Sequence, residues 1–429
     1  MKMNKTNRPA RSSITVLGQL CNLIPNHLVP RLAREHGIGA QARSFSPWSH
    51  VVALLHAQLS HAIGLNDVCD SLALHSGPLS AVRGATPPPR NTLSHANRTR
   101  DAAMGEQLFW AVLGHLQSVD RRFATARMGR GVLRRFRACV HAVDTTVIEL
   151  VANCMDWAKH RRRKAAAKLH LRLSLQSLLP SCAIVGGAKQ ADGRRAREIC
   201  AGLQPGEIGV FDRAYVDFAH LADLTGRGVW WVTRAKANMA HTVVERRPAP
   251  EGSRILRDEI VGLVKRAGKT GEFVRRVEAI VEVDGRDRVM VFLTNNLGWS
   301  PRTVCEMYRC RWDIEVFFKQ IKQTLNLCDF LGHSANAVRW QIWTALLVYV
   351  LLRFRAHLSR WAHSFTRLFT LVRAALWDRI DLSGLLRGYG TAGGSLAFVS
   401  APHEAWLPGI VETVGQHRRR RRLWKTRNT

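Results

Sequence analysis

From Tyr308 to Lys322 the chain reads Tyr-Arg-Cys-Arg-Trp-Asp-Ile-Glu-Val-Phe-Phe-Lys-Gln-Ile-Lys. Ser300-Pro301 upstream is typical of a helix start, because a capping side chain is followed by proline at the first helical position. At roughly 100° per residue, one face of this helix gathers polar side chains within about 80° of one another: Tyr308, Arg311, Glu315, Lys319 and Lys322. Apolar side chains gather on another side: Ile314, Phe317, Phe318, Ile321 and Leu325. The stretch therefore predicts one helix with an apolar back and a polar front.

The polar front has two explanations. A solvated helix surface with Glu–Lys pairs four residues apart would gain a few tenths of a kcal/mol per pair. Alternatively, Glu315 holds a metal ion while its basic neighbours hold phosphates. The helix alone does not decide between the two.

The charge of the chain restricts its partner. Lysine and arginine number 64 against 32 acidic residues, a net charge of +32 over 429 residues. Such an excess, spread along the whole chain, favours a polyanion such as DNA. An anionic membrane surface is the competing explanation, but the longest apolar run, Ile342 to Leu352, has 11 residues and is too short to span a bilayer. We expect this run to form a buried core helix and the protein to have no membrane partner.

The cysteines and the N-terminus indicate a location. The apolar stretch after Ser13 is broken by Gln19 and Asn22, which makes a poor signal peptide. Nine cysteines are scattered without a Cys-x-x-Cys pair, so their spacing predicts neither a disulfide framework nor a zinc site. We therefore expect a cytoplasmic protein.

Residues 1–130 are predicted to form a helical domain. Ser46-Pro47 opens one helix, and a longer amphipathic helix spans about 104–118. Between them, a run of three prolines leads into a short polar helix over 90–100. A short polar helix after other helices is typical of a helix-turn-helix DNA reader, and an ordinary polar surface helix is the alternative. On the first explanation, the candidates for recognising DNA ends are Arg90, Asn91, His95 and Arg98.

The pattern changes to strands at Cys139. Strands are predicted over about 139–144, 168–175, 183–185, 208–212 and 229–233, with helices over about 194–200 and 216–225. Asp284-Gly285 predicts a hairpin within a β-rich insertion of about 237–295. Another helix is expected near 364–378. The predicted fold class is α/β, a mixed sheet preceded by an all-helical N-terminal domain.

Two of the predicted strands end at an acid, Asp144 and Asp212. Alone, an aspartate at a strand end is usually a cap or a turn residue. Two such ends in one sheet can bring both carboxylates to the same place, and a packed helix can add Glu315. Three carboxylates within about 4 Å repel by several kcal/mol at the effective dielectric of a protein. They need a cation, and oxygen ligands favour Mg²⁺ or Mn²⁺.

These residues resemble a known family. Tyr308, Arg311, Glu315 and Lys322 match in type and spacing the Y-x(2)-R-x(3)-E-x(6)-K signature of the insertion sequence four family of DDE transposases. Asp144-Thr145-Thr146 is similar to the first-acid motif of that family, and Phe211-Asp212-Arg213-Ala214-Tyr215 to the second. The resemblance covers roughly 139–378. It implies a ribonuclease-H-like catalytic domain over 137–378, with the β-rich insertion before the third acid.

The resemblance implies a role for each matching residue. Asp144, Asp212 and Glu315 would be the catalytic triad and would bind two Mg²⁺ ions, for which Mn²⁺ can substitute. Contacts to DNA phosphates would come from Tyr308, Arg311, Lys319, Lys322 and Arg234. For Lys319 and Arg234, a plain surface charge is the alternative.

The chain departs from some relatives at one position. Those relatives carry a tryptophan in the insertion, which stacks on a flipped base during a DNA-hairpin step. Our alignment places Met290 there, beside Val289, and methionine offers no comparable ring for stacking. The resemblance therefore predicts cleavage and strand transfer without predicting a hairpin intermediate.

Two basic runs and several further acids remain. The run from Lys159 to Lys164 is expected to form a loop or helix end lining the DNA channel, with a solvated surface run as the alternative. A C-terminal segment, 379–429, carries five consecutive arginines from Arg418 to Arg422, which are expected to contact phosphate. The acids not expected to act are Asp156, Asp217, Asp223 and Asp313.

The predicted function is that of a cut-and-paste DNA transposase. The helical domain would bind the inverted-repeat ends, and the catalytic domain would hydrolyse phosphodiester bonds before the freed 3′-hydroxyl attacks target DNA. The resemblance also implies a homodimer in the DNA complex and a prokaryotic, nucleoid-associated location. A metal-dependent nuclease without strand transfer would use the same triad. A DNA-binding repressor or a decayed copy would keep the basic charge without the reaction.

Overall fold

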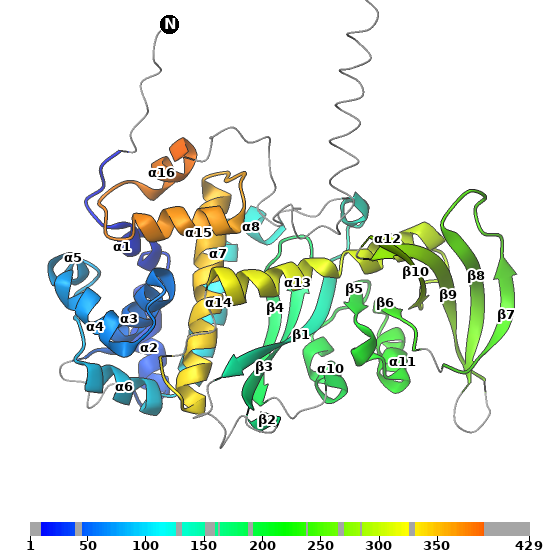
Figure 1. Ribbon diagram of the computed structural model, residues 1–429, viewed down its shortest axis with the longest axis horizontal. Helices are drawn as coiled ribbons and strands as arrows, with labels where there is room; N and C mark the ends of the chain where they lie inside the picture. The colour runs from blue at the N-terminus through cyan, green and yellow to red at the C-terminus, as the bar shows by residue number, and fades with distance from the viewer. Residues whose placement is uncertain are drawn as a thin grey trace, which may run out of the picture.

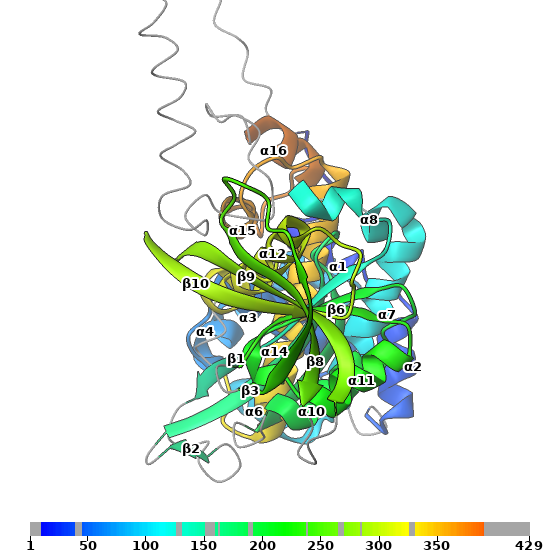
Figure 2. The same cartoon turned by 90° about the vertical axis from the view of Figure 1, so that its right-hand side faces the viewer.

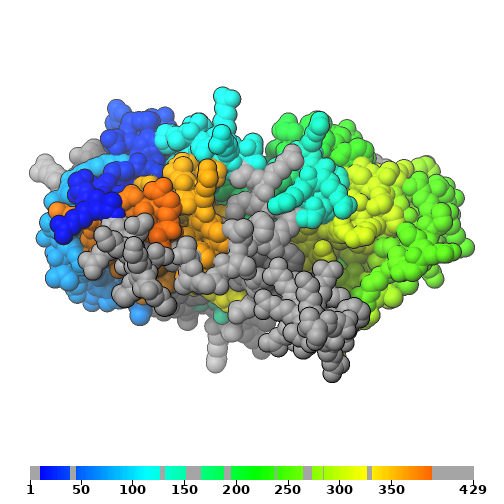
Figure 3. Space-filling view, turned by 90° about the horizontal axis from the view of Figure 1, so that it is seen from above, coloured from blue at the N-terminus to red at the C-terminus, as the bar shows by residue number. Residues whose placement is uncertain are grey.

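The computed structural model describes residues 10–38, 45–125, 131–150, 159–161, 164–187, 192–236, 239–264, 270–283, 285–325 and 331–389. The molecule is elongated, with the N-terminal helices at one end and a group of insertion strands at the other (Figures 1 and 3). The N-terminal helices are α1 (Val16–Cys21), α2 (Leu28–Glu35), α3 (Pro47–Ser60), α4 (Leu65–Leu74), α5 (Ser76–Ser80), α6 (Arg90–Thr99), α7 (Ala103–Val119) and α8 (Arg121–Thr125).

One ten-stranded sheet runs through the rest, in the order β2-β3-β1-β5-β6-β10-β9-β8-β7, with β4 also paired to β3. Its strands are β1 (Val140–Leu150), β2 (Lys159–Arg161), β3 (Lys164–Ser174), β4 (Pro180–Gly187), β5 (Ile208–Phe211), β6 (Trp230–Arg234), β7 (His241–Arg247), β8 (Ile255–Val264), β9 (Thr270–Val283) and β10 (Arg286–Thr294). The β1–β5 and β5–β6 pairs are parallel, and the sheet is therefore mixed as predicted. Figure 2 shows the twist of the insertion strands end on.

The parallel strands are aligned so that the residues following their last paired positions lie next to one another at one end of the strands. Val143 of β1 is in register with Phe211 of β5, and Phe211 is in register with Thr233 of β6. The residues that follow these three are Asp144, Asp212 and Arg234. Two acids and one arginine thus lie side by side where the parallel pairing stops.

Asp144 lies in the middle of its strand, and the prediction that the strand ends there is wrong. β1 continues to Leu150 because β3 pairs with it along this whole length, from His141 opposite Ser174 to Leu150 opposite Ala165. What ends at Asp144 is only the parallel pairing with β5.

Helices cover both faces of the sheet. α12 (Pro301–Arg309) and α13 (Trp312–Lys319) lie on one face, and α10 (Asp192–Cys200) and α11 (Phe218–Gly226) on the other, with single-turn helices η1 (Gly131–Arg135) and η3 (Arg213–Tyr215) between elements. Val140 and Ala142 of β1 belong to the same apolar cluster as Ile314 of α13, whereas Val143 packs with the α10 side. Because successive strand residues point to opposite faces, Asp144 points toward α13.

The helix predicted from Ser300 is divided into α12, α13 and a π-helical turn, η4 (Gln320–Thr324). At Cys310 and Arg311 the backbone stays helical, with φ of −62° and −56°, but the hydrogen bonds tighten. Arg311 N–H donates to Tyr308 O, and Ile314 N–H to Arg311 O, in both cases three residues back. The predicted apolar back is confirmed, since five side chains are buried: Ile314, Phe317, Phe318, Ile321 and Leu325.

The long core helix predicted around Ile342 is α14 (Ala335–Leu358), which precedes α15 (Phe365–Ala374) and α16 (Leu382–Tyr389). In the described part of the chain, α14 is the helix long and apolar enough to cross a membrane, but 83% of its most apolar window is buried inside the protein. It packs on α3, α6 and α7. Trp340 Nε1–H donates to Arg100 O at 2.7 Å, and Asn336 Nδ2–H donates to Asn97 O at 2.9 Å.

The N-terminal helices, β1 and α14 share one apolar cluster. The division of the chain at 130–137 and at 378–379 stays a prediction.

The β9–β10 hairpin is confirmed, with Gly285 at φ +70° in the turn. The prediction that the basic run from Lys159 forms a loop or helix end is wrong, because Lys159 and Arg161 belong to β2 and pair with the start of β3. The run from Arg418 to Arg422 lies outside the described residues.

Gly105 of α7 allows that helix to approach α14. A Cβ at Gly105 would lie 2.8 Å from Cε3 of the buried Trp340 indole. Gly105→Ala should therefore destabilise the fold by about 1–3 kcal/mol, the usual range for overpacking a core. The change should be measured as a lower thermal unfolding midpoint.

Gly114, on the exposed side of α7, is the matched control, since nothing lies within 4 Å of its added Cβ. Gly114→Ala should raise stability by about 0.5–1 kcal/mol through helix propensity. Equal stabilisation by both substitutions would contradict the packing described.

Candidate active site

The Arg311 side chain lies between two of the predicted acids. Its Nη1–H donates to Asp144 Oδ2 at 2.8 Å, and its Nη2–H donates to Glu315 Oε1 at 2.7 Å. Arg311 is only 7% exposed. Its Cζ lies 5.6 Å from the ring centroids of both Tyr308 and Trp312. One buried guanidinium thus joins the sheet to α13.

The second acid is held by the preceding turn of the same helical segment. Tyr308 OH donates to Asp212 Oδ1 at 3.3 Å. The Tyr308 ring is buried and lies 5.0 Å, centroid to centroid, from Phe292 of β10. The structure therefore brings Asp144, Asp212 and Glu315 together around Tyr308 and Arg311.

The charge of this group suits a divalent cation. Burial raises the pKa of Asp144 to about 6; Arg311 opposes this rise, and the neighbouring Asp212 and Glu315 carboxylates add to it. Three carboxylates face one guanidinium, so negative charge is in excess. The donors are all oxygen, the set that Mg²⁺ and Mn²⁺ prefer, and the residues fit such an ion.

The carboxylates are nevertheless not drawn tightly around one point. Among the described residues, three ligand atoms within 4.8 Å of one another occur at Cys139, His141 and Glu207, and not at the triad. The reason is the width of the Arg311 guanidinium, which lies between Asp144 and Glu315.

Further basic residues lie around the acids. Arg234, half-buried at the end of β6, lines a cavity of about 290 Å³ together with Asp212, Tyr308 and Arg311. Lys319 is exposed at the end of α13, one turn beyond Glu315. Lys322 is half-buried in η4.

Met290 also lines that cavity, from β10, where it pairs with Ala279. Trp312, which is 38% exposed, lines the same cavity from α13. The position compared with the stacking tryptophan of some relatives is therefore next to the acids, and an indole from another element lies nearby.

The residues predicted to read DNA ends lie on α6, among the N-terminal helices and away from α13 (Figure 1). Their side chains are exposed, whereas Leu93, Ala96 and Asn97 on the same helix are buried. The exposed set is Arg90, Asn91, His95 and Arg98. Their role stays a prediction.

Sequence reasoning missed a hydrogen-bonded network behind the acids. Thr145 N–H donates to Asp144 Oδ1 at 2.7 Å, and the Thr145 hydroxyl bonds to His170 Nδ1 at 2.7 Å and to Tyr215 OH. Thr145 and Tyr215 belong to the first- and second-acid motifs, so this contact ties the two motifs together. His170, fully buried, gave no signal beyond its place in an alternating strand.

Two of the acids not expected to act have local structural partners. Asp217 caps α11 by accepting from His220 N–H at 2.9 Å. Asp223 lies 3.6 Å from Arg227 on the same helix. Asp313 lies half-buried in the first turn of α13, and Asp156 lies outside the described residues.

Comparison with known proteins gives matches over both halves of the chain. Residues 135–351 match a family described as the transposase DDE domain, and residues 12–82 match a domain of unknown function (DUF4372). A protein of Sinorhizobium fredii that is named as a transposase is 30% identical over 304 residues, 70% of this chain and 81% of the relative. A protein of Geobacillus stearothermophilus named as a transposase for an insertion sequence element is 29% identical over 222 residues, 51% of this chain and 57% of the relative.

Among the solved structures that match, one covers much of the chain. It is the cryo-EM structure of the piggyBac transposase synaptic complex with hairpin DNA. The match covers 88% of this chain and 80% of that chain, with 7% sequence identity and a TM-score of 0.40.

The raised pKa of Asp144 predicts how pH affects ion binding. With a folded-state pKa of about 6, Asp144 becomes protonated as the pH falls through that value, and a proton then competes with the ion. The affinity for Mn²⁺, measured by calorimetry on the full chain, should therefore fall between pH 7.5 and pH 5.5, chosen as roughly one and a half units above and half a unit below that pKa.

Asp217→Asn is the control and should keep the same pH dependence, because this acid caps α11. An affinity that is unchanged across this range would count against Asp144 as a ligand.

Proposed function

The chain belongs to the transposase DDE domain family, and from this we propose that it cuts DNA at transposon ends and joins them to target DNA with Asp144, Asp212 and Glu315 as its catalytic triad. Its function is that of a DNA transposase. The observation that carries the residue assignment is the gathering of the three acids around Tyr308 and Arg311.

The family depends on a divalent metal ion, and we propose two Mg²⁺ ions here, with Mn²⁺ able to substitute. Bound at the three carboxylates, they would supply positive charge for the attacking and leaving oxygens of the phosphoryl transfer. Thr145 and Tyr215 hold the two aspartate-bearing strands in position from behind.

Arg311 changes partners in this proposal. Its planar guanidinium matches a phosphate as well as a carboxylate, through two parallel hydrogen bonds. Once bound metal ions neutralise the carboxylates of Asp144 and Glu315, the attraction that holds Arg311 between them is lost. Arg311 then binds the phosphate next to the cleaved bond, and the carboxylates can approach each other.

The other basic side chains would hold DNA backbone on either side. Tyr308 and Arg234 share a cavity with Asp212 and would contact the phosphate at the cut. Lys319 and Lys322 lie farther along the helical segment and would contact the backbone near the transposon end.

We place recognition of the double-stranded inverted-repeat ends on α6. Two ends must be held together for joining, so the DNA complex would contain a homodimer. DNA as substrate places the protein in the cytoplasm with the nucleoid, and no membrane is involved.

Asp212→Asn tests the triad. Removing one ligand charge should lower cleavage and joining of end DNA on the order of a thousandfold or more, because the bound ions supply several kcal/mol of transition-state stabilisation. End binding, measured by gel shift, should be nearly unchanged. Full activity in Asp212→Asn would overturn the assignment.

Asp217→Asn, five residues away at the cap of α11, is the control and should keep activity. Wild-type protein with pre-cleaved ends separates the alternatives. Joined product is expected, whereas hydrolysis without joining would indicate a nuclease, and binding without either reaction a repressor or a decayed copy.

Lys319→Ala tests the phosphate contacts. An exposed lysine that neutralises one phosphate contributes about one unit to the slope of log K against log salt concentration. The variant should bind DNA more weakly whatever the DNA sequence, and its slope of log K against log salt concentration should be shallower by about one unit.

Arg31→Ala on α2 is the control, because Arg31 is an exposed cation that already faces Glu35 at 3.5 Å. It should leave the slope unchanged. Equal slopes in Lys319→Ala and wild type would assign Lys319 to the solvated surface.

A further inference from the structure

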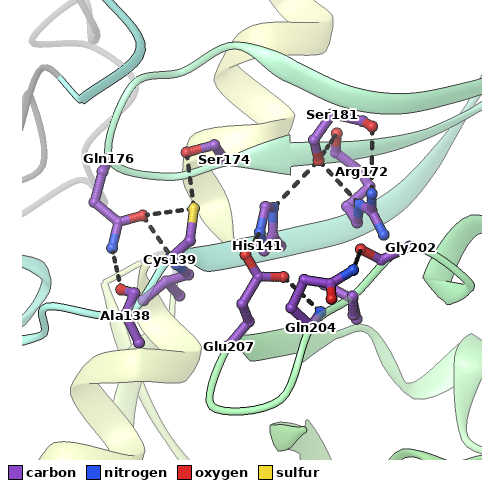
Figure 4. A network of polar contacts seen from close by, with 12 residues as sticks. Ala138, Cys139, His141, Arg172, Ser174, Gln176, Ser181, Gly202, Gln204 and Glu207 are labelled. Carbon is purple, nitrogen blue, oxygen red and sulfur yellow. Dashed lines mark hydrogen bonds and ion pairs between the residues drawn. The ribbon is translucent and has the colours of Figure 1, made fainter. Parts of the chain in front are cut away.

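A second group of ligand-type side chains lies on the strands that carry Asp144 and Asp212. Cys139 precedes β1, His141 is the second residue of β1, and Glu207 precedes β5. Ile208 N–H donates to Cys139 O at 3.0 Å, which places Glu207 beside Cys139. One ligand atom from each of the three lies within 4.8 Å of the others (Figure 4).

This group is separate from the triad. His141 lies two residues before Val143 and therefore shares its face, the α10 side of the sheet, whereas Asp144 points toward α13. The group also lies at the opposite end of the parallel pairing, since Cys139 and Glu207 precede its first pair and His141 is in its second, whereas Asp144 and Asp212 follow its last pair.

Ser181 determines which nitrogen of His141 carries a proton. Ser181 Oγ–H donates to Arg172 O at 3.1 Å, and its oxygen accepts from Arg172 Nε–H at 2.9 Å. A hydroxyl has one proton to donate. The 3.2 Å contact of Ser181 Oγ with His141 Nδ1 is therefore one in which Nδ1–H donates. In the neutral imidazole, Nε2 then carries the lone pair.

That nitrogen is buried and points at negative groups. His141 is 5% exposed, and its Nε2 has no hydrogen-bond partner among the described residues. Glu207 Oε1 lies 3.4 Å away. A lone pair facing a carboxylate and a sulfur is unfavourable unless a cation lies between them, and that cation is either a proton or a metal ion. Burial acts to lower the pKa of His141, but contacts with Cys139 and Glu207 raise it above the ordinary value.

The arrangement does not suit a nucleophilic cysteine. In a Cys–His–Glu relay, the sulfur and the carboxylate bond to opposite ring nitrogens. Here the carboxylate faces Nε2, and Nδ1 is occupied by Ser181. The free Nε2, the sulfur and the carboxylate converge instead as ligands of one ion would.

We propose that Cys139, His141 and Glu207 bind one Zn²⁺ ion. Sulfur, imidazole nitrogen and carboxylate oxygen are the donors that tetrahedral zinc takes, and they differ from the all-oxygen triad. The Glu207 side chain is 24% exposed, so a water can complete the four ligands from that side. Ser181 acts as the outer partner that orients a zinc-bound histidine.

The environment of Cys139 agrees with this assignment. Gln176 does not compete as a ligand, because its Oε1 accepts from Val140 N–H at 2.9 Å and its Nε2–H donates to Ala138 O at 2.9 Å. The ion would fasten the start of β1 to the start of β5, which sets the register of Asp144 against Asp212.

Cobalt(II) binding to the full chain tests the proposal. The Asp144→Asn/Asp212→Asn background removes the triad as a competing site. One equivalent of Co²⁺ should bind with a thiolate charge-transfer absorption, and Zn²⁺ should displace it. Cys139→Ser should abolish the absorption, whereas Cys182→Ser should keep it, because the half-buried thiol of Cys182 on β4 is outside the group.

Two further variants cover the case in which Cys139→Ser does not fold. Glu207→Gln keeps an oxygen to accept from Gln204 N–H, a contact of 2.9 Å, and should weaken Zn²⁺ binding at least about tenfold. Ser181→Ala should weaken it by about 10–100-fold. Absence of Co²⁺ binding by the folded background protein would overturn the proposal, as would equal affinity in folded Glu207→Gln. Neither result would bear on the transposase assignment.

Discussion

The site depends on a single buried cation. Arg311 bonds at once to Asp144 on the sheet, 167 positions away in the chain, and to Glu315 on α13, so it fixes the distance between these two segments. Burial disfavours the charge on Arg311, but Tyr308 and the three acids more than offset this and raise its pKa above the ordinary value. Arg311 therefore stays charged, and the acids are held together before DNA or an ion arrives. The guanidinium thus offsets the mutual repulsion of the acids in the absence of an ion.

Much of this arrangement follows from alternation along the strands, which the sequence shows. The buried strands, the acids after Val143 and Phe211, and the apolar back of α13 could be predicted because each depends on local periodicity. The tightened turn at Cys310 and Arg311 could not, since the apolar pattern continues unchanged through it. The β2 pairing of the basic run was also missed, because six consecutive polar residues carry no strand signal.

The group at Cys139 shows a different limit of sequence reasoning. Cys139 and Glu207 are 68 positions apart, and the parallel pairing of β1 with β5 brings them together. Cysteine spacing predicted no zinc site, because such predictions depend on ligands that are near one another in the chain. The same two strands thus present the oxygen donors Asp144 and Asp212 to the α13 face of the sheet. Because side chains alternate along a strand, Cys139, His141 and Glu207 are presented to the other face.

The contact of Trp340 with Arg100 spans 240 positions and has a consequence for synthesis. A ribosome adding about 5–20 residues per second needs on the order of ten seconds or more to deliver α14 after α6 has emerged. During that interval the surfaces of α3, α6 and α7 that pack on α14 lack this partner. A polypeptide terminated before Ala335 never receives that partner, so we expect premature stops to yield fragments that expose apolar surface.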